Sequence, residues 1–193
     1  MTTVIRVIML ACMLWVSVAV AEDPLDKERS ALKGLLGQIE SAINNRDIDQ
    51  LTGAMHKDVM VTFLNGEVVR GIPAVRDYFD RMLGSDSAIL KQYRTRAKEA
   101  QPATIIGHVA LADGESKDEF VFADGSVMKF DTLWSTSLVQ EDGQWRVRQL
   151  HFSANVFDNP ILAAVEKSII FSSIIALIIG LGLGALLTRK FWK

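Results

Sequence analysis

Residues 138–153 read LVQEDGQWRVRQLHFS, two β-prone segments joined by a tight turn at Asp142-Gly143. An Asp-Gly pair between such segments is among the strongest short-range signals for a hairpin. Asp113-Gly114 and Asp124-Gly125 interrupt the preceding chain in the same way. The sequence from about residue 92 onward therefore predicts consecutive antiparallel strands with turns at all three pairs.

The segment before these strands is helical in pattern. From Pro24 to Asn45 the apolar residues recur at spacings of three and four, which predicts one long amphipathic helix. A second short helix is expected from Asp47 to near His56, and a third over residues 72–83. Between them, residues 58–64 predict a strand that runs into the hairpin signal Asn65-Gly66. Helices followed by a run of strands indicate an α+β fold whose sheet can curl around a helix and leave a conical cavity.

Three stretches resemble a known superfamily. SAINNRDIDQL (41–51), VTFLNG (61–66) and RGIPAVRDYF (70–79) resemble the first half of nuclear transport factor 2-like, or SnoaL-like, domains. Residues 138–153 resemble the closing hairpin of that superfamily, and the spacing from Trp145 to His151 and Ser153 is similar to the association domain of calmodulin-dependent protein kinase. The resemblance covers about residues 28–157. It implies a cone-shaped, curved antiparallel sheet packed on N-terminal helices, but that fold hosts many functions.

Both ends of the chain carry membrane signals. Residues 1–21 have a basic residue, an apolar run and the small-x-small sequence Ala19-Val20-Ala21, the pattern of a signal peptide cleaved before Glu22. An uncleaved N-terminal anchor is the alternative. Residues 168–187 contain no charge, and twenty helical residues span about 30 Å, the thickness of the hydrocarbon core.

The domain boundaries and the orientation follow from these signals. We expect a signal peptide (1–21), a nuclear transport factor 2-like domain (22–158), a helical stalk (159–167), a transmembrane helix (168–188) and a tail (189–193). Arg189, Lys190 and Lys193 belong on the cytoplasmic side by the positive-inside rule. The domain is then extracytoplasmic, and the short signal favours the periplasmic side of a bacterial inner membrane. Asn159 and Pro160 are suited to begin the stalk helix.

Composition narrows the class of partner. Residues 22–166 hold 16 Lys and Arg against 23 Asp and Glu, a formal charge of −7, which argues against nucleic acid. Cys12 is the only cysteine and lies in the signal segment, so the domain must fold without a disulfide. His56 and His108 stand in no metal-binding spacing, and no phosphate-binding loop appears, so neither a metal nor a cofactor is expected.

The last strand supplies the candidate ligand-binding residues. Strict alternation places on one face a row of mixed aromatic and polar side chains: Trp145, Val147, Gln149, His151, Ser153 and Asn155. If this row lines the cone, His151 could act as a general base or hold an anionic ligand, with Gln149, Ser153 and Asn155 beside it. The alternative is a structural histidine. Trp134, on the preceding strand, is a further candidate for ligand contact.

Two other residues are candidates for catalysis. Isomerases of the resembling superfamily pair a carboxylate base with a tyrosine or a second acid. Asp131 could be the carboxylate if its face of the strand is concave, although a solvent-facing aspartate is the commoner case. Tyr78 could be the tyrosine, but it also fits core packing. No unmistakable pair of this kind is visible in the sequence.

The membrane helix carries a stripe of small residues at every fourth position. Its members include Ser172, Ala176, Gly180 and Gly184. Such spacing lets two helices approach closely, which predicts a homo-oligomer or a membrane-protein partner. The sequence thus favours an anchored, non-catalytic module that binds a small ligand or a protein. The alternatives are an isomerase- or cyclase-like enzyme with His151 as base, and a scaffold subunit of an envelope complex.

Overall fold

The computed structural model describes residues 24–84 and 87–191. The helices are α2 (Pro24–Asn45), α3 (Ile48–Gly53), α4 (Gly71–Phe79), which continues as a π-helical turn (Asp80–Gly84), and α5 (Pro160–Phe191). The strands are β1 (Met55–Thr62), β2 (Val68–Arg70), β3 (Leu90–Glu99), β4 (Thr104–Ile106), β5 (Val109–Phe122), β6 (Val127–Glu141) and β7 (Gln144–Ala154). The predicted order of helices and strands is confirmed.

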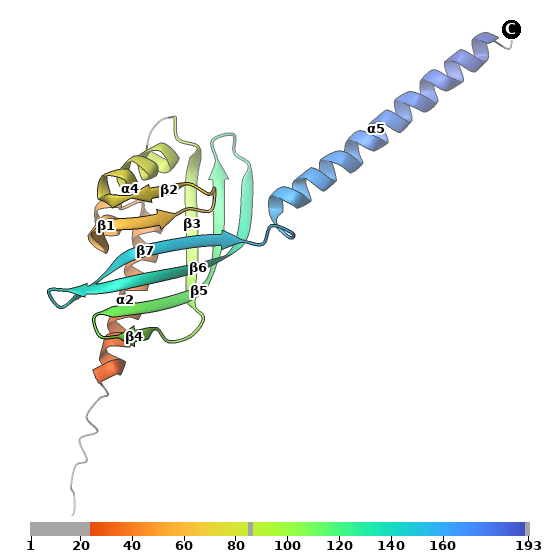
Figure 1. Cartoon of the computed structure of the whole chain (residues 1–193). Helices are drawn as coiled ribbons and strands as arrows, with labels where there is room; N and C mark the ends of the chain where they lie inside the picture. The colour runs from red at the N-terminus through yellow and green to blue at the C-terminus, as the bar shows by residue number, and fades with distance from the viewer. Residues whose placement is uncertain (1–23, 85–86, 192–193) are drawn as a thin grey trace, which may run out of the picture.

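One curved sheet forms the body of the domain (Figure 1). Its strands follow the order β2-β1-β7-β6-β5-β3, and β4 pairs with β5. The sheet is mixed, because β1 and β7 are parallel while the other neighbours are antiparallel. The expected antiparallel pairing is thus found at every pair of neighbouring strands except this one. The long stretch of chain between β1 and β7 brings β7 beside β1 in the same direction. A hairpin could not make this connection, because it joins antiparallel strands.

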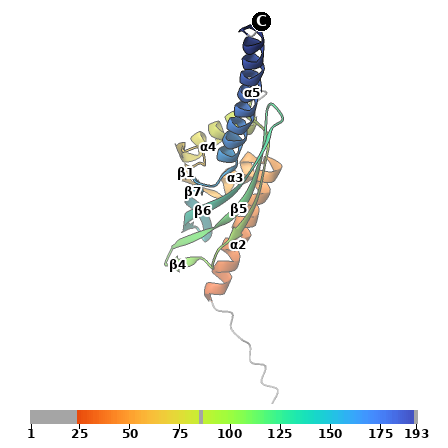
Figure 2. The ribbon, with the colours of Figure 1, turned by 90° about the vertical axis from the view of Figure 1, so that its right-hand side faces the viewer.

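Helix α2 lies along one face of the sheet, which we call the inner face, and α5 points away from the domain (Figures 1 and 2). The apolar stripe predicted for residues 24–45 packs on this face. The core joins Leu32 and Ala42 of α2 to Trp134, Val147 and Leu150 of the sheet. Among the described residues, no helix lies along the opposite, outer face of the sheet in either view.

Strand β5 corrects the predicted turn at Asp113-Gly114. The strand runs through both residues, and Gly114 pairs with Trp134 of β6. A Cβ atom on Gly114 would lie 2.4 Å from the indole Cζ2 of Trp134 and 2.1 Å from the Lys98 carbonyl oxygen. Glycine is needed here for close approach inside a strand and not for a turn. The turn at Asp142-Gly143 is confirmed, with φ angles of 50° and 74°.

Strand β7 does not keep the strict alternation expected from its sequence. Its register with β6 shifts by one residue, since Leu138 pairs with Val147 but Ser137 pairs with Gln149. This bulge leaves Arg148 as an extra residue, and its guanidinium donates to the carbonyl of Asp58 on β1. A bulge reverses the side-chain alternation beyond it. Trp145 and Val147 before the bulge are buried, and after it Leu150 takes the inward position.

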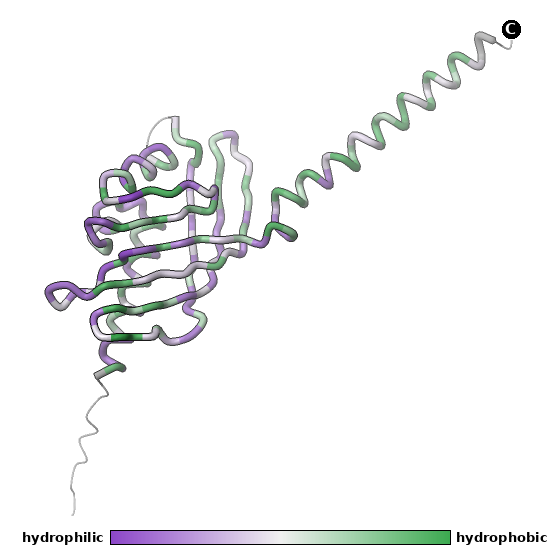
Figure 3. Tube along the Cα trace, viewed as in Figure 1, coloured by the Kyte–Doolittle hydropathy of each residue, from purple (hydrophilic) through white to green (hydrophobic). Residues whose placement is uncertain are grey.

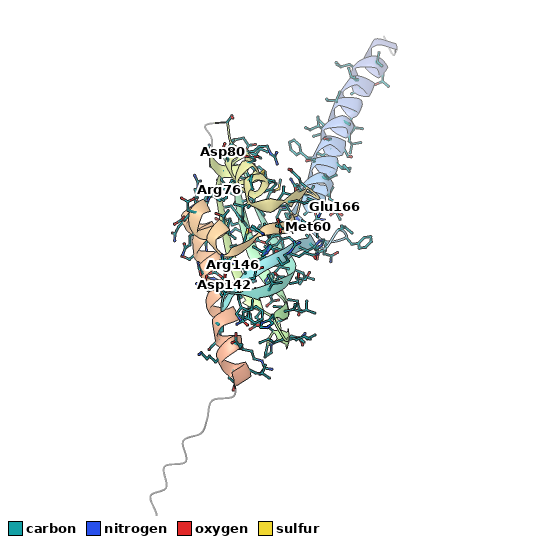
Figure 4. The ribbon with its side chains drawn as sticks, turned by 60° about the vertical axis from the view of Figure 1, so that its left-hand side comes forward. Met60, Arg76, Asp80, Asp142, Arg146 and Glu166 are labelled. Carbon is teal, nitrogen blue, oxygen red and sulfur yellow. The ribbon has the colours of Figure 1, made fainter. Side chains whose placement is uncertain are left out.

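Helix α5 leaves the end of the domain opposite the β6–β7 turn. Figure 4 shows Asp142 and Arg146 near that turn and Glu166 at the domain end of α5. The cap is as predicted: Asn159 Oδ1 accepts hydrogen bonds from the backbone N–H groups of Ile161 and Leu162. The helix is apolar along most of its length (Figure 3), and residues 160–188 are long and apolar enough to cross a membrane without burial against the domain.

Candidate functional site

Two apolar cavities lie between the inner face of the sheet and the helices. The first has a volume of about 70 Å³ and reaches toward the N-terminal half of α2. The second has a volume of about 110 Å³ and reaches toward α4 and the π-helical turn. Five side chains line both cavities: Ile39, Ile43, Tyr93, Leu150 and Phe152. A dry apolar cavity of about 150 Å³ takes up benzene. Each of these cavities is smaller than that, and the two together are larger, so the space suits a small apolar molecule that reaches into both.

A buried polar cluster meets these cavities, and we call Tyr93, Ser116, Asp118 and Thr132 the Asp118 cluster. The Tyr93 hydroxyl donates to Asp118 Oδ1 at 2.9 Å. Ser116 Oγ lies 3.2 Å from Asp118 Oδ2, and Thr132 Oγ1 donates to the same oxygen. Asp118 and Thr132 are 3% and 2% exposed. A carboxylate buried this deeply requires several donors, and the cluster supplies three.

The strand register explains why these four side chains meet. Ser116 pairs with Thr132, and Asp118 pairs with Thr95, which places Asp118 diagonally beside Tyr93. Alternation along β5 turns Ser116 and Asp118 toward the inner face. The cluster therefore draws on three neighbouring strands and stands on the rigid part of the fold.

Tyr93 remains a neutral hydrogen-bond donor over a wide pH range. Burial, then the charge of Asp118 and the hydrogen bond to it, raise the pKa of Tyr93 well above its usual range, against a smaller opposing effect of a hydrogen bond with Thr95. The Tyr93 ring stacks on Phe120 with centroids 4.7 Å apart. The hydroxyl is thus held in one direction, toward the carboxylate.

Tyr78 lies in the aromatic wall of the second cavity, where it stacks on Phe63 at a centroid distance of 3.6 Å. Burial, followed by the charge of Glu67, raises the pKa of Tyr78 to about 12, although nearby Arg81 lowers it. No hydrogen bond joins Tyr78 to Asp118 in the described chain, and the stacking agrees with the packing alternative.

The predicted ligand-binding residues fall into two groups. Trp134 is buried, lines the first cavity, and donates from its indole nitrogen to the Glu115 carbonyl at 3.2 Å. The other four are exposed and line neither cavity: Gln149, His151, Ser153 and Asn155. Placing them in one row with Trp145 and Val147 is wrong, because the bulge at Arg148 turns Gln149, His151 and Ser153 to the outer face.

Asp131 also lies on the outer face. Its side chain is 88% exposed and lies 3.8 Å from the ammonium group of Lys117. Thr132 and Trp134, which alternate with Asp131 along this strand, point inward. Asp131 is therefore on the side of the strand opposite the Asp118 cluster.

Tyr93 and Asp118 were not singled out from the sequence. The Asp113-Gly114 pair suggested a turn, which broke β5 into pieces and hid its alternation. In a continuous strand, alternation places one carboxylate, Asp118, on an otherwise small or apolar inward face. The inward positions are Ala110, Ala112, Gly114, Ser116 and Asp118. That pattern is the signal available in the sequence.

The buried histidine pairs with a carboxylate away from both cavities. His56 Nδ1 accepts from the Asp58 N–H at 3.0 Å, and Nε2 lies 3.1 Å from Glu141 Oε1. This contact ties β1 to the β6–β7 turn. Over the described ranges, no group of three His, Cys, Asp or Glu side chains is placed to hold a metal ion.

Comparison with known families agrees with this architecture. The SnoaL-like domain family matches residues 33–157, most of the chain outside its two ends. The chain therefore belongs to the SnoaL-like domain family. No curated protein matches it in sequence.

Solved structures with the same fold include enzymes and proteins defined only by their fold. A hexachlorocyclohexane dehydrochlorinase, LinA-type3, from Novosphingobium barchaimii is 11% identical with a TM-score of 0.59, covering 67% of this chain and 87% of that one. A nuclear transport factor 2-like protein from Salmonella enterica serovar Typhimurium is 14% identical with a TM-score of 0.58, covering 68% and 93%. These identities show the fold alone, which is nuclear transport factor 2-like.

Proposed function

We propose that the protein is a membrane-anchored, extracytoplasmic SnoaL-like module that binds a small, largely apolar molecule inside its cone without transforming it. The observation that carries this proposal is the Asp118 cluster, a satisfied polar group at the wall of two otherwise apolar cavities. Pockets of that composition are typical of small-molecule sites, where apolar walls give affinity and a few polar atoms give orientation.

A binding role is favoured because the hydroxyl groups of the cluster already donate to Asp118. A general base must accept a proton from its substrate, and hydrogen bonds within the cluster already occupy three of the acceptor positions of this carboxylate. None of the described residues that line the two cavities is a histidine. The cavities also weigh against the scaffold alternative, for which a filled cone would suffice.

An enzyme is the second candidate, and the site of its chemistry would differ from the one expected. His151 lies on the outer face, so a base in the cone would be Asp118 and the tyrosine beside it Tyr93. The occurrence of a dehydrochlorinase among the structural neighbours favours keeping this candidate. Chemical conversion of the bound molecule during incubation with the protein would identify the protein as an enzyme.

The proposed location follows from the two ends of the chain. The predicted signal peptide (1–21) lies outside the described residues, and α5 supplies one candidate span. We place the domain in the periplasm of a bacterial inner membrane and the C-terminus in the cytoplasm. A protease added to intact spheroplasts should digest the domain and spare a C-terminal epitope tag; a digested tag would reverse the orientation.

Native mass spectrometry of the full chain, released from detergent micelles, tests the binding role. We expect a bound small molecule in the wild type and in His151→Ala, because His151 is on the outer face. Ile43→Phe should lose it, because Ile43 lines both cavities and the larger ring fills the space between them. The thermal midpoint of each variant serves as the folding control. Loss in a folded His151→Ala together with retention in Ile43→Phe would move the site to the outer face.

A further inference from the structure

Every hydroxyl hydrogen of the Asp118 cluster has an acceptor within the cluster. Each hydroxyl has a single hydrogen, and the Tyr93 hydrogen points to Asp118 Oδ1. Thr132 donates to Oδ2, and Ser116 Oγ lies 2.6 Å from Thr132 Oγ1 and 3.2 Å from Oδ2. The Ser116 hydrogen is therefore used on either of these acceptors. No hydroxyl hydrogen of the cluster remains for a molecule in the cone.

The cluster consequently presents only acceptors. Asp118 Oδ1 receives one hydrogen bond within the cluster, and a carboxylate oxygen has room for two. No lysine, arginine or histidine among the described residues forms an ion pair with Asp118. Within the cluster, its carboxylate is contacted by hydroxyl groups alone. A further donor is favoured at this position, and a further acceptor is repelled.

A buried acceptor in the wall of an apolar cavity discriminates strongly between ligands, and Asp118 lines the second cavity. A ketone, ether or ester would place its oxygen against the carboxylate without a hydrogen bond, and both groups would lose water. An alcohol or an amine would place a hydrogen there. A buried polar group therefore distinguishes between ligands more strongly than the shape of an apolar wall does.

We propose that the cone selects small apolar molecules that carry one hydrogen-bond donor, an alcohol or an amine, and that Asp118 receives this donor. This inference rests on the proposed binding function and names its ligand class. The second cavity suits a flat hydrocarbon portion, since two stacked pairs, Phe63 with Tyr78 and Tyr93 with Phe120, form part of its wall. The donor would sit where this cavity meets the cluster.

Four probes of nearly equal shape test the selection: 1-phenylethanol, 1-phenylethylamine, acetophenone and isopropylbenzene. Affinities are measured on the full chain in detergent by ligand-detected nuclear magnetic resonance. Asp131→Asn is the matched control, since it makes the same substitution on the outer face, and signals common to all variants report partition into micelles. We expect the alcohol and the amine to bind about tenfold or more tightly than acetophenone, the range of a hydrogen bond to a charged group.

Asp118→Asn should reduce or reverse this preference, because its amide nitrogen can donate to a ketone, whereas Asp131→Asn should preserve it. If Asp118→Asn does not fold, Tyr93→Phe serves instead: it frees Oδ1 and should keep the preference for donors. Equal or tighter binding of acetophenone by the wild type overturns the ligand class and leaves the binding function standing. Binding of none of the four probes, with no small molecule retained in native mass spectra, overturns both.

Discussion

The side-chain amide of Asn44 pairs with both backbone groups of Thr95. Asn44 Nδ2 donates to the Thr95 carbonyl at 2.9 Å, and Oδ1 accepts from the Thr95 N–H at 2.8 Å. Glu40, one turn earlier on α2, accepts from the Ala97 N–H at 2.8 Å. Strand β3 is an edge of the sheet, so α2 covers backbone groups that would otherwise invite pairing with another chain.

Asn44→Ala removes both hydrogen bonds and leaves the Thr95 backbone groups without them. We expect a loss of about 1–3 kcal/mol in the free energy of unfolding, because Thr95 is buried. Asn45→Ala is the control, since Asn45 is exposed and its side-chain amide donates to Ser41 of its own helix. Denaturant titration of the full chain in detergent measures both. A cost for Asn44→Ala no larger than that for Asn45→Ala would show that the contact does not protect the edge.

Gly114 offers a second test because its Cβ space is occupied. Gly114→Ala would push a methyl group into the Trp134 ring and the Lys98 carbonyl, and a backbone oxygen cannot move aside as a flexible side chain can. We expect a loss of at least about 2 kcal/mol, in the range of overpacked cores. Gly37→Ala should instead gain about 0.5–1 kcal/mol, since nothing lies within 4 Å of its added Cβ in the middle of α2. Thermal unfolding measures the change in stability of both variants. A change of the same sign in both would contradict this prediction.

Gly114 is also a position whose structure could not be predicted from the local sequence. The helices could be predicted because apolar spacing reports the face that a helix buries. Asp124-Gly125 and Asp142-Gly143 could be predicted as turns because those dipeptides favour positive φ, which both glycines adopt. The same dipeptide at Asp113-Gly114 lies inside a strand. Only the partner strand, which brings Trp134 over Gly114, distinguishes the two cases.

The candidate site depends even more on long-range register. Trp134 could be identified from β6 alone, because an aromatic residue on a clean alternating strand has a predictable face. The exposure of His151 could not, since it follows from one extra residue at Arg148. The pairing of Tyr93 with Asp118 follows from the alignment of β3 on β5, which no local pattern encodes.

The two tyrosines predict an unusual alkaline titration. Tyr78 and Tyr93 are the only tyrosines of the chain, so all tyrosinate absorbance near 295 nm belongs to them. Burial raises the pKa of Tyr78 to about 12 from an ordinary value of 10.0, and raises that of Tyr93 well above its usual range. We therefore expect almost no tyrosinate at pH 10.5 in the folded chain, whereas the denatured chain should ionise about pH 10.

The same pKa shifts determine how stability depends on pH. A raised folded-state pKa means that the folded chain holds the proton more tightly than the unfolded chain. Below pH 10 the tyrosines cause no change in the free energy of unfolding. As the pH rises from 10 toward 12, this free energy decreases. Tyr78→Phe should make this decline shallower. All tyrosinate absorbance of this variant then comes from Tyr93. A tyrosinate signal that appears at pH 10 in folded protein would contradict the burial of both hydroxyls.

The membrane helix permits a test of association that is separate from the cone. Gly180 and Gly184 belong to the small-residue stripe, while Gly182 lies between them and points to another side of the helix. All three have open space around an added Cβ, so each can be enlarged without strain inside the chain. If the stripe is a helix contact, Gly180→Leu and Gly184→Leu should weaken association of the full chain in bilayers, and Gly182→Leu should not.

Fluorescence energy transfer between two labelled populations in lipid vesicles, at several protein-to-lipid ratios, measures that association. The two on-stripe variants should behave as monomers at dilutions where the wild type still transfers energy. Ligand binding in the cone should persist in them, since the cavities lie wholly within residues 32–152. Equal transfer by all three leucine variants and the wild type would show that the small-residue stripe is not the helix contact.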